Sequence, residues 1–386
     1  MHLIPEFPAS KLPHVGTTIF SVMSQLAQEE GAINLGQGFP GFPIDEHLIS
    51  LVNKAMSAGY NQYAPMPGWP ALREAIALKM KRLWEMDINP NAEVTITAGG
   101  SQAIFTAIGA LIQPGDEVIL FAPAYDCYAP AIELNGGVVK WVELEYPHWN
   151  IPWDKLESAY SSKTKLVMIN TPHNPTGKVW SADEMSKMAN WILEKKLFLI
   201  SDEVYEHITF DDRPHTSMAL FKEIRQQTML IYSFGKTFHA TGWKMGYAIG
   251  PENWMREFRK QHQFNVFTCH TPTQVAFAEY MKDTTIYDAI SPMYQAKRNL
   301  IMSALQNPVF EALLTEGTYF QLLKWKGESE LSDVELAKKW TIENKITLIP
   351  ISVFFPSQID MRLFRLCFAK EDNDLIEAAA RLNQIQ

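Results

Sequence analysis

The chain has 386 residues, a formal net charge of −9 and a pI near 5.6, and this acidic balance argues against nucleic-acid binding. Its three cysteines are widely spaced and its histidines lack metal-ligand spacing, so we expect neither disulfides nor a metal site. No apolar run approaches the ~18 residues of a membrane helix. Residues 1–8 lack the features of a signal peptide, and we therefore expect a cytoplasmic protein that does not bind membranes.

Apolar strands alternate with helical patterns through the first three quarters of the sequence. The predicted strands lie near 94–97, 117–121, 166–170, 197–201, 228–232 and 246–249, and the helical stretches include 71–83 and 183–195. This alternation predicts an α/β fold with a largely parallel sheet. Beyond about residue 285 a long helical pattern and strands with alternating apolar residues predict a smaller α+β unit.

The first chemical motif follows the strand at 94–97. Gly100, Ser101 and Gln102 open an apolar helix directly after a glycine turn. Free N–H groups and the positive end of the helix dipole make such a start a binding site for an anion. A Gly-Gly-Ser turn is weak evidence by itself, and there is no Walker-type sequence here.

The next two strands also end in polar residues. Asn174 follows the strand at 166–170 and precedes a proline, which favours an extended backbone and fixes the direction of its side chain. Asp202 ends the strand at 197–201, and alternation puts Glu203 on the opposite face. Tyr205 faces the same side as Asp202 if the strand continues. Asp202 could instead cap the following segment, which is the commoner role of a strand-end aspartate.

Lys236 lies just after the end of the apolar strand at 228–232, which places it at the carboxyl edge of the sheet, where α/β proteins bind ligands. Ser233 and Lys244 flank it with a hydroxyl and a cation suited to one phosphate. An amine for covalent chemistry beside an anion site is what an enzyme carrying pyridoxal 5'-phosphate needs. Asp202 would pair with the pyridine nitrogen of this cofactor, and Asn174 would donate to its phenolate oxygen. For this segment alone, a solvated loop lysine is an equally good explanation.

Taken together and in this order, these motifs resemble those of the class I aminotransferases, the fold-type I pyridoxal phosphate enzymes. The resemblance covers essentially the whole chain. It extends to four further segments, which are 36–40 (a substrate loop that contains Gly38), 61–65 (with Tyr63), 121–128 (with Tyr125) and 362–369 (with Arg365).

The resemblance implies a large cofactor-binding domain at 46–284 and a small domain formed by 1–45 and 285–386. It implies a homodimer in which Tyr63 reaches the phosphate of the partner subunit, and Lys236 as the catalytic residue. The cofactor contacts that it implies are Tyr63, Gly100, Ser101, Gln102, Tyr125, Asn174, Asp202, Tyr205, Ser233, Lys236 and Lys244, and the substrate contacts are Gly38, Asn174 and Arg365.

Two residues depart from the aspartate aminotransferases. Lys244 replaces a phosphate-binding arginine, so a point charge takes the place of a bidentate fork. Tyr125 replaces a tryptophan but can still stack on the cofactor ring. The surrounding residues are similar to the kynurenine aminotransferase and glutamine transaminase K subgroup, and more similar still to the bacterial methionine aminotransferases.

The expected activity is transamination between a large neutral amino acid (methionine, aromatic or kynurenine-like) and a 2-oxo acid. The segments 38–42, 125–128 and 265–267 offer aromatic faces, and no residue clearly supplies a second cation for a dicarboxylate. Two alternatives are β-elimination of a cysteine S-conjugate and a non-enzymatic protein that binds the cofactor. The second is disfavoured because Lys236 and Arg365 are both present.

Overall fold

The computed structural model describes residues 9–386, so the expectation of no signal peptide, which rests on residues 1–8, lies outside the described residues. Its α-helices are α1 (Ile19–Glu29), α2 (Glu46–Ser57), α3 (Pro70–Trp84), α4 (Gly99–Leu111), α5 (Tyr128–Leu134), α6 (Trp153–Ala159), α7 (Ala182–Lys195), α8 (Phe234–Thr237), α9 (Glu252–Asn265), α10 (Thr271–Tyr280), α11 (Ile290–Ala304), α12 (Asp333–Glu343) and α13 (Asp372–Leu382). Short 3₁₀ turns occupy Met218–Leu220, Lys222–Gln227, Thr241–Trp243, Thr284–Tyr287 and Ile351–Phe354.

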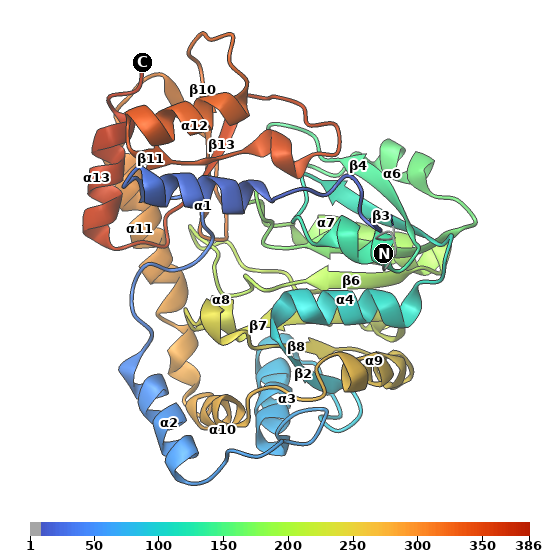
Figure 1. Cartoon of the computed structure of the whole chain (residues 1–386). Coiled ribbons are helices and arrows are strands. Elements are labelled where there is room, and N and C mark those ends of the chain that lie inside the picture. Colours follow the sequence, from blue (N-terminus) through green and yellow to red (C-terminus); the bar gives the residue numbers. More distant parts are fainter. Residues whose placement is uncertain (1–8) are drawn as a thin grey trace, which may run out of the picture.

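A large sheet lies at the centre of the described chain (Figure 1). Its strands are β2 (Val94–Thr97), β3 (Glu117–Ala122), β4 (Val138–Glu143), β5 (Thr164–Asn170), β6 (Phe198–Asp202), β7 (Thr228–Ser233) and β8 (Gly246–Ile249), in the order β2-β8-β7-β6-β5-β3-β4. Neighbouring strands from β7 to β4 run parallel, whereas β8 is antiparallel to both β2 and β7. The sheet confirms the predicted α/β fold class.

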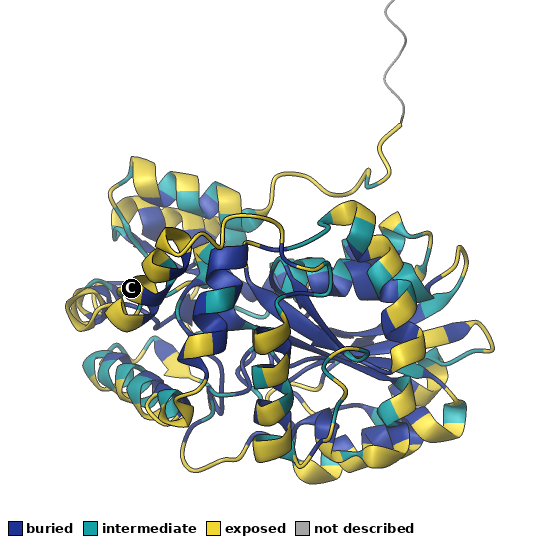
Figure 2. Ribbon diagram, turned by 90° about the horizontal axis from the view of Figure 1, so that it is seen from below, coloured by how far each residue is buried: buried dark blue, intermediate teal, exposed yellow. Residues whose placement is uncertain are grey.

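Helices cover both faces of this sheet, because successive side chains of each strand point to opposite faces and both sets are apolar. Ile200 belongs to a core shared with α4, α5 and α9, whereas its neighbour Leu199 belongs to a core shared with α3 and α7. The side chains of Ile200 and Leu199 are both fully buried. Figure 2 shows the result, with dark buried strands between helices whose outer sides are exposed.

A second group of strands lies towards the carboxyl end of the sequence. The strands β9 (Phe310–Ala312), β10 (Phe320–Trp325), β12 (Ile349–Pro350) and β13 (Leu363–Cys367) form an antiparallel sheet in the order β12-β13-β10-β9. The short strand β1 (Ile33–Asn34) pairs in parallel with β11 (Ile346–Thr347). Helix α1 lies across these late elements beside α12 (Figure 1), so the segment from α1 to β1 packs against the carboxyl-terminal region.

Local sequence explains where several of these elements begin. The helix α7 starts with a capping box in which Ser181 and Glu184 satisfy one another's backbone N–H groups, and Ser332 and Glu335 do the same for α12. Pro70 occupies the first turn of α3, where its missing N–H costs no hydrogen bond. Within the described residues, no helix has both the length and the apolar character needed to cross a bilayer.

Candidate active site

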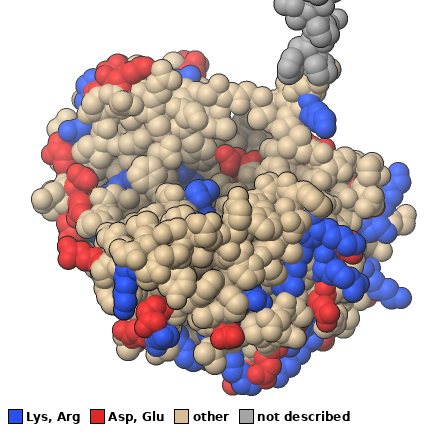
Figure 3. Space-filling view, turned by 60° about the horizontal axis from the view of Figure 1, so that its bottom comes forward, with Lys and Arg blue, Asp and Glu red and all other residues tan. Residues whose placement is uncertain are grey.

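A cavity of about 330 Å³ opens at the carboxyl ends of the parallel strands. Figure 3 shows a face of the molecule that is hollowed, with acidic and basic side chains lying in the hollow. The cavity is lined from the large sheet, from the segment at Thr18–Phe20 and from β10 and β13. It contains every residue predicted to bind cofactor or substrate except Tyr63 and Gln102.

One end of the cavity is built around the start of α4. Gly99 has a φ of +81°, and a β-carbon there would lie 3.5 Å from Nζ of Lys244. Lys244 and Ser233 both line the cavity at this end with Gly100 and Ser101. Backbone N–H groups, a helix dipole, a hydroxyl and an ammonium group therefore meet here, which is a set of donors suited to a phosphate.

Gln102 does not line the cavity. Its Oε1 accepts from the N–H of Ala98 at 3.0 Å, and its Nε2 donates to Thr106 Oγ1 at 2.7 Å. These bonds hold the first turn of α4 in place. The side chain predicted as a phosphate contact therefore supports the start of the helix and does not face the cavity.

Lys236 lies in α8, directly after β7, as predicted for the end of a buried strand. Its Nζ donates to the carbonyl oxygen of Gly38 at 3.1 Å and to the hydroxyl of Tyr319 at 2.7 Å, and Tyr319 donates to the same Gly38 oxygen at 2.6 Å. Burial lowers the pKa of Lys236 to about 8. A substantial fraction of this amine is therefore neutral, and thus nucleophilic, near physiological pH.

Asp202 ends β6 and lies on the face of the sheet that α4 and α5 cover. The hydroxyl of Tyr128 donates to its Oδ2 at 2.5 Å, and the N–H of Val204 donates to Oδ1 at 3.3 Å. Desolvation raises the pKa of Asp202 to about 6, although the hydrogen bond from Tyr128 opposes this shift. A cation in the cavity would therefore lower the free energy of this buried carboxylate.

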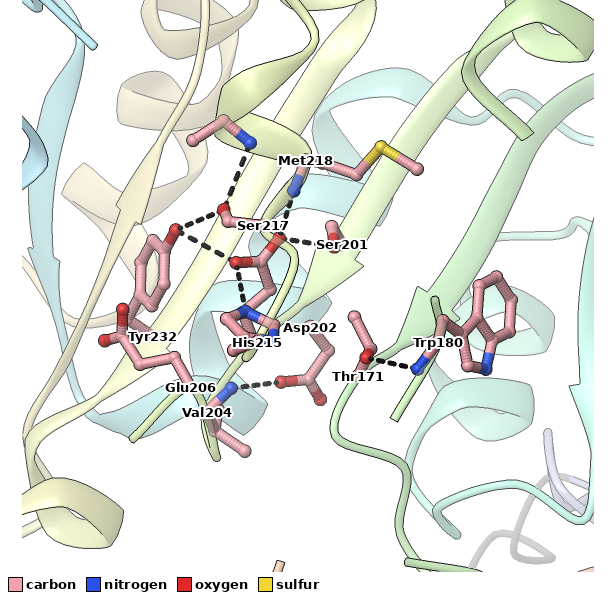
Figure 4. A network of polar contacts seen from close by, with 12 residues as sticks. Thr171, Trp180, Ser201, Asp202, Val204, Glu206, His215, Ser217, Met218 and Tyr232 are labelled. Carbon is pink, nitrogen blue, oxygen red and sulfur yellow. Dashed lines mark hydrogen bonds and ion pairs between the residues drawn. The ribbon is translucent and has the colours of Figure 1, made fainter. Parts of the chain in front are cut away.

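Glu203, the rival carboxylate, faces away from the cavity, as alternation predicts. Its Oε1 accepts from Ser201 and from the N–H of Met218, both at 2.9 Å, and its Oε2 lies 3.1 Å from Nε2 of His215 and 3.2 Å from the hydroxyl of Tyr232. Figure 4 shows these partners converging, with Asp202 outside the group. Glu203 is thus already satisfied by the protein itself.

At the opposite side of the cavity, Arg365 is buried in β13. Its two terminal nitrogens donate to Asn174 Oδ1 at 2.8 Å and to the carbonyl oxygen of Gly36 at 2.9 Å, and the guanidinium lies 3.9 Å from the ring centre of Phe320. Its Nε is buried without a partner. Burial lowers the pKa of Arg365 to about 10, so it remains charged at neutral pH and is suited to hold a carboxylate.

The hydrogen bond from Arg365 also orients Asn174. Because the side-chain oxygen of Asn174 accepts from Arg365, its amide NH₂ is left to donate elsewhere in the cavity. The backbone N–H of Asn174 donates to Asn170 Oδ1 at 2.8 Å, which fixes the turn. Two predicted residues that lie 191 positions apart in sequence are therefore in direct contact.

Two of the three predicted tyrosines line the cavity, and the third lies outside it. Tyr125 reaches Ser101 at 3.4 Å between hydroxyl oxygens, which brings its ring beside the phosphate end. Tyr205 lines the cavity although β6 ends at Asp202, so the turn that follows the strand directs it there. Tyr63 is 82% exposed and contacts the ring of Phe267, with centroids 5.2 Å apart.

Sequence reasoning assigned no role to Tyr128 and Tyr319, the hydroxyls that bond Asp202 and Lys236. Tyr128 stood in the segment 121–128, where a second aromatic three residues after Tyr125 was the available signal. Tyr319 belonged to a predicted strand and carried no local signal of a role in the site, because its partners Gly38 and Lys236 are distant in sequence.

The residues of this cavity fit pyridoxal phosphate in their donor set. The neutral amine of Lys236 could bond the aldehyde carbon, and the desolvated carboxylate of Asp202 could pair with the pyridine nitrogen. The ring of Tyr125 could stack on the face of the cofactor, and the start of α4 could bind the phosphate. A cavity that combines these groups on this fold defines an enzyme that works on amino acids at a covalently held cofactor.

Comparison with known proteins gives the family. Residues 30–382 match the class I and II aminotransferases, and the chain belongs to this family. It is an enzyme of the transaminase type, and its family depends on pyridoxal phosphate.

Individual relatives agree with this assignment. The chain is 44% identical over 382 residues to the methionine aminotransferase of Escherichia coli K12, covering 99% of each chain, and 32% identical over 401 residues to kynurenine–oxoglutarate transaminase 3 of Rattus norvegicus, covering 95% of this chain and 88% of the relative. These names give no support to the alternative of a β-lyase.

Solved structures confirm the fold. That of YbdL from Escherichia coli, described with a methionine aminotransferase function, superposes with a TM-score of 0.96 at 44% identity and covers 99% of this chain and 100% of that one. A double mutant of Thermus thermophilus aspartate aminotransferase gives 0.90 at 26% identity, covering 98% and 100%. The predicted fold-type I architecture is therefore confirmed.

Proposed function

We propose that this enzyme transfers the amino group of a large neutral amino acid, with methionine as the leading donor, to a 2-oxo acid, using pyridoxal phosphate held at Lys236. The observation that carries the proposal is the cavity itself, where Lys236, Asp202 and Arg365 line one space. Bound pyridoxal phosphate supplies an electron-withdrawing ring that stabilises negative charge at the α-carbon of the amino acid.

The residues of the chain divide the remaining work. Arg365 binds the α-carboxylate of the substrate in a fork geometry, and Asn174, fixed by Arg365, donates its amide N–H to the phenolate oxygen of the cofactor together with Tyr205. Nζ of Lys236 accepts the proton from the α-carbon of the substrate and would donate it to the C4′ carbon of the cofactor. Tyr319 and the Gly38 carbonyl hold that nitrogen in place through their hydrogen bonds.

Asp202 and the phosphate end position the cofactor. Asp202 keeps a proton on the pyridine nitrogen, because the positive charge there compensates for the burial of its carboxylate. Gly100, Ser101, Ser233 and Lys244 hold the phosphate. These assignments keep the reacting carbon near Lys236 through many turnovers.

The rest of the lining favours a neutral side chain. Phe20, Ile104, Tyr125 and Phe320 present apolar surface to the cavity, and its three cations are Lys236, Lys244 and Arg365. Each of these cations already has a role, so none is left for a second substrate carboxylate. The names of the methionine and kynurenine relatives support the same class of donor.

The test of this proposal is Lys236→Ala, with Lys282→Ala, a substitution in the exposed turn after α10, as the matched control. We expect the first variant to lose the visible absorbance of the covalently held cofactor and multiple-turnover transamination of methionine, while phosphate contacts still retain pyridoxal phosphate. The control keeps both properties. Sustained turnover by Lys236→Ala without added amine would overturn the assignment.

We also propose a homodimer with composite active sites. In the single chain, Tyr63 is exposed beside Phe267, and Phe264, three residues before Phe267, is 90% exposed. Exposed aromatic rings of this kind are typical of a protein–protein interface. A second copy of the chain would cover these rings and bring the Tyr63 hydroxyl to the phosphate end of the neighbouring cavity.

Hybrid dimers test this arrangement. Lys236→Ala chains are mixed with chains that carry Tyr63→Phe and Arg365→Ala together. Because Lys236 and Arg365 of one chain line the same cavity, neither site of the hybrid contains both, and activity stays low. The affinity for pyridoxal phosphate should rise at the site with intact Lys236, relative to the double-variant homodimer, because its neighbour supplies the Tyr63 hydroxyl. It should fall at the Lys236→Ala site, whose neighbour lacks that hydroxyl. A fully active monomer in sedimentation would contradict the proposal.

The division of the chain completes the proposal. We place the cofactor-binding domain at 46–284 and the small domain at 1–45 and 285–386, supported by the separate sheets of the two parts and by the packing of α1 and β1 on the later one. The free state of Cys127, Cys269 and Cys367 supports work in a reducing compartment such as the cytoplasm.

A further inference from the structure

One charged side chain in the cavity has no part in the proposed chemistry. The charged residues of the lining are the cations Lys236, Lys244 and Arg365 and the anions Asp126 and Asp202. The amine, the phosphate, the substrate α-carboxylate and the pyridine nitrogen account for four of them. Asp126 is the one that remains.

Asp126 lies in the turn between β3 and α5, next to Tyr125. Its side chain lines the cavity and is also exposed, so it stands where the cavity opens to solvent. Within residues 9–386, no other side chain forms a hydrogen bond or an ion pair with its carboxylate. Its donors are the backbone N–H groups of Asp126 and Cys127, which favour the ionised form, so the carboxylate presents a negative charge to a substrate that enters the cavity.

The charge of Asp126 acts on the part of the cavity that binds substrate. Asp126 and Arg365 line the same cavity. The protein that surrounds the partly exposed carboxylate raises the pKa of Asp126 by desolvation, and the positive charge of Arg365 counteracts this rise. They form no ion pair, because the terminal nitrogens of Arg365 bond Asn174 and Gly36 instead. Asp126 is thus near the group that holds the α-carboxylate without neutralising it.

We propose that Asp126 determines the charge specificity of this enzyme by repelling substrates that carry a second carboxylate. This inference rests on the proposed function, because it assumes that Arg365 binds the α-carboxylate and leaves the substrate side chain on the side of Asp126. A neutral side chain meets only the aromatic lining. An anionic side chain meets Asp126 in a space where surrounding protein weakens solvent screening.

The experiment compares two donors of nearly equal shape, glutamine and glutamate, against one common 2-oxo acid. We expect Asp126→Asn to lower the ratio of kcat/KM for glutamine to that for glutamate by at least about fivefold relative to the wild type. Asp126→Glu, which keeps the charge, should preserve most of the wild-type ratio. Asp212→Asn, the same chemical change at an exposed residue outside the cavity, should leave the ratio unchanged.

A binding measurement checks the same point without turnover. Glutarate and its monoamide glutaramate are titrated into the holoenzyme by calorimetry. We expect the wild type to bind glutaramate more tightly than glutarate, and Asp126→Asn to reduce this difference by a similar factor. Added salt should reduce the difference in the wild type as well.

The outcomes separate this inference from the proposed function. If the wild type transaminates methionine but Asp126→Asn leaves both ratios unchanged, the inference is wrong and the proposed function stands. An equal loss for all donors would assign Asp126 to the substrate amino group or to the support of Arg365, and would also overturn the inference. If Lys236→Ala still turns over methionine, the proposed function itself fails.

Discussion

The end of β6 carries two neighbouring carboxylates with opposite environments. Glu203 receives four hydrogen-bonding partners from the protein, and although burial alone would raise its pKa, the bond with His215 and the other donors hold it below the ordinary value. Asp202 receives two, and its pKa is raised to about 6 by desolvation. A buried carboxylate with too few hydrogen-bonding partners of its own is therefore suited to bind a cationic ligand.

The buried lysines on the two faces show the same contrast. Lys79 forms an ion pair with Glu206, donates to Tyr247 at 2.8 Å and lies 4.5 Å from the ring centre of Tyr232. Lys236 has a carbonyl and a hydroxyl as partners but forms no ion pair in the described chain. The Glu203 face thus stabilises the fold, while the Asp202 face holds its charges at a cost that the cofactor is expected to offset.

The largest effect should come from breaking the ion pair on the structural face. Lys79→Ala leaves Glu206 buried without its cation, so we expect the free energy of unfolding of the apoprotein to fall by about 3–5 kcal/mol. Denaturant titration measures this loss. The double variant Lys79→Met, Glu206→Leu should recover most of it, since an apolar pair needs no desolvation of charge. Lys79→Ala as stable as the wild type would show that the pair contributes little.

The cavity face should respond in the opposite sense. Asp202→Asn removes a desolvated charge, so we expect the apoprotein to stay as stable as the wild type or become slightly more stable. We expect kcat/KM to fall by about a hundredfold, or roughly 2.7 kcal/mol of barrier, because asparagine cannot stabilise a protonated pyridine nitrogen.

Glu203→Gln is the matched control for this prediction. It should lose stability, because a neutral amide cannot accept from all four partners, yet keep kcat/KM per folded molecule within about threefold. If Glu203→Gln lost as much activity as Asp202→Asn, the distinction between the two faces would not hold.

The sequence was a good guide where a strand is buried on both sides. The apolar runs of β6 and β7 predict these strands and place Asp202 and Lys236 at their ends. The edge strand β4 was not predicted, because Val138–Glu143 is half-buried and mixes charged with apolar residues. Edge strands lack the continuous apolar run that marks a central one.

The hydrogen-bonding partners of side chains across the cavity were harder to predict from the sequence. Tyr205 reaches the cavity through a turn and not through continued strand alternation, although the predicted location holds. Gln102 was expected at the phosphate, but a cap inside α4 uses its amide, and a linear pattern does not show which of two hydrogen bonds forms. The bond between Lys236 and Gly38 spans 198 residues, so only the folded chain reveals it.

A smaller effect is the dependence of stability on pH. Because the pKa of Asp202 is about 6 in the folded protein and 3.8 for an unperturbed aspartate, the folded state binds one more proton than the unfolded state between these pH values. The contribution of Asp202 to apoprotein stability therefore falls as pH rises from about 4 to about 6, and stays low above that. We expect the stability difference between wild type and Asp202→Asn to change by about 1–2 kcal/mol over this window.

Adding the cofactor sharpens this prediction. A positive charge on the pyridine nitrogen lowers the pKa of Asp202, so its contribution to the holoenzyme should no longer fall over that window. Denaturation of apoprotein and holoenzyme at several pH values measures both. The same pH dependence in both forms would mean that the bound cofactor does not pair with Asp202.

The smallest effect concerns the hydroxyl that holds Lys236. Tyr319→Phe removes one acceptor from Nζ, and a net hydrogen bond of about 1 kcal/mol corresponds to roughly a fivefold loss of kcat/KM. The acceptor also favours the charged amine, so its loss should lower the pKa of Lys236 further below about 8. The rate at which pyridoxal phosphate attaches to apoprotein reports this pKa, and its midpoint should move to lower pH. Tyr294→Phe removes a buried hydroxyl that bonds His239 at 2.9 Å instead, and should leave the midpoint in place. An equal shift in both variants would assign the effect to general packing of the aromatic cluster and not to the hydrogen bond of Tyr319.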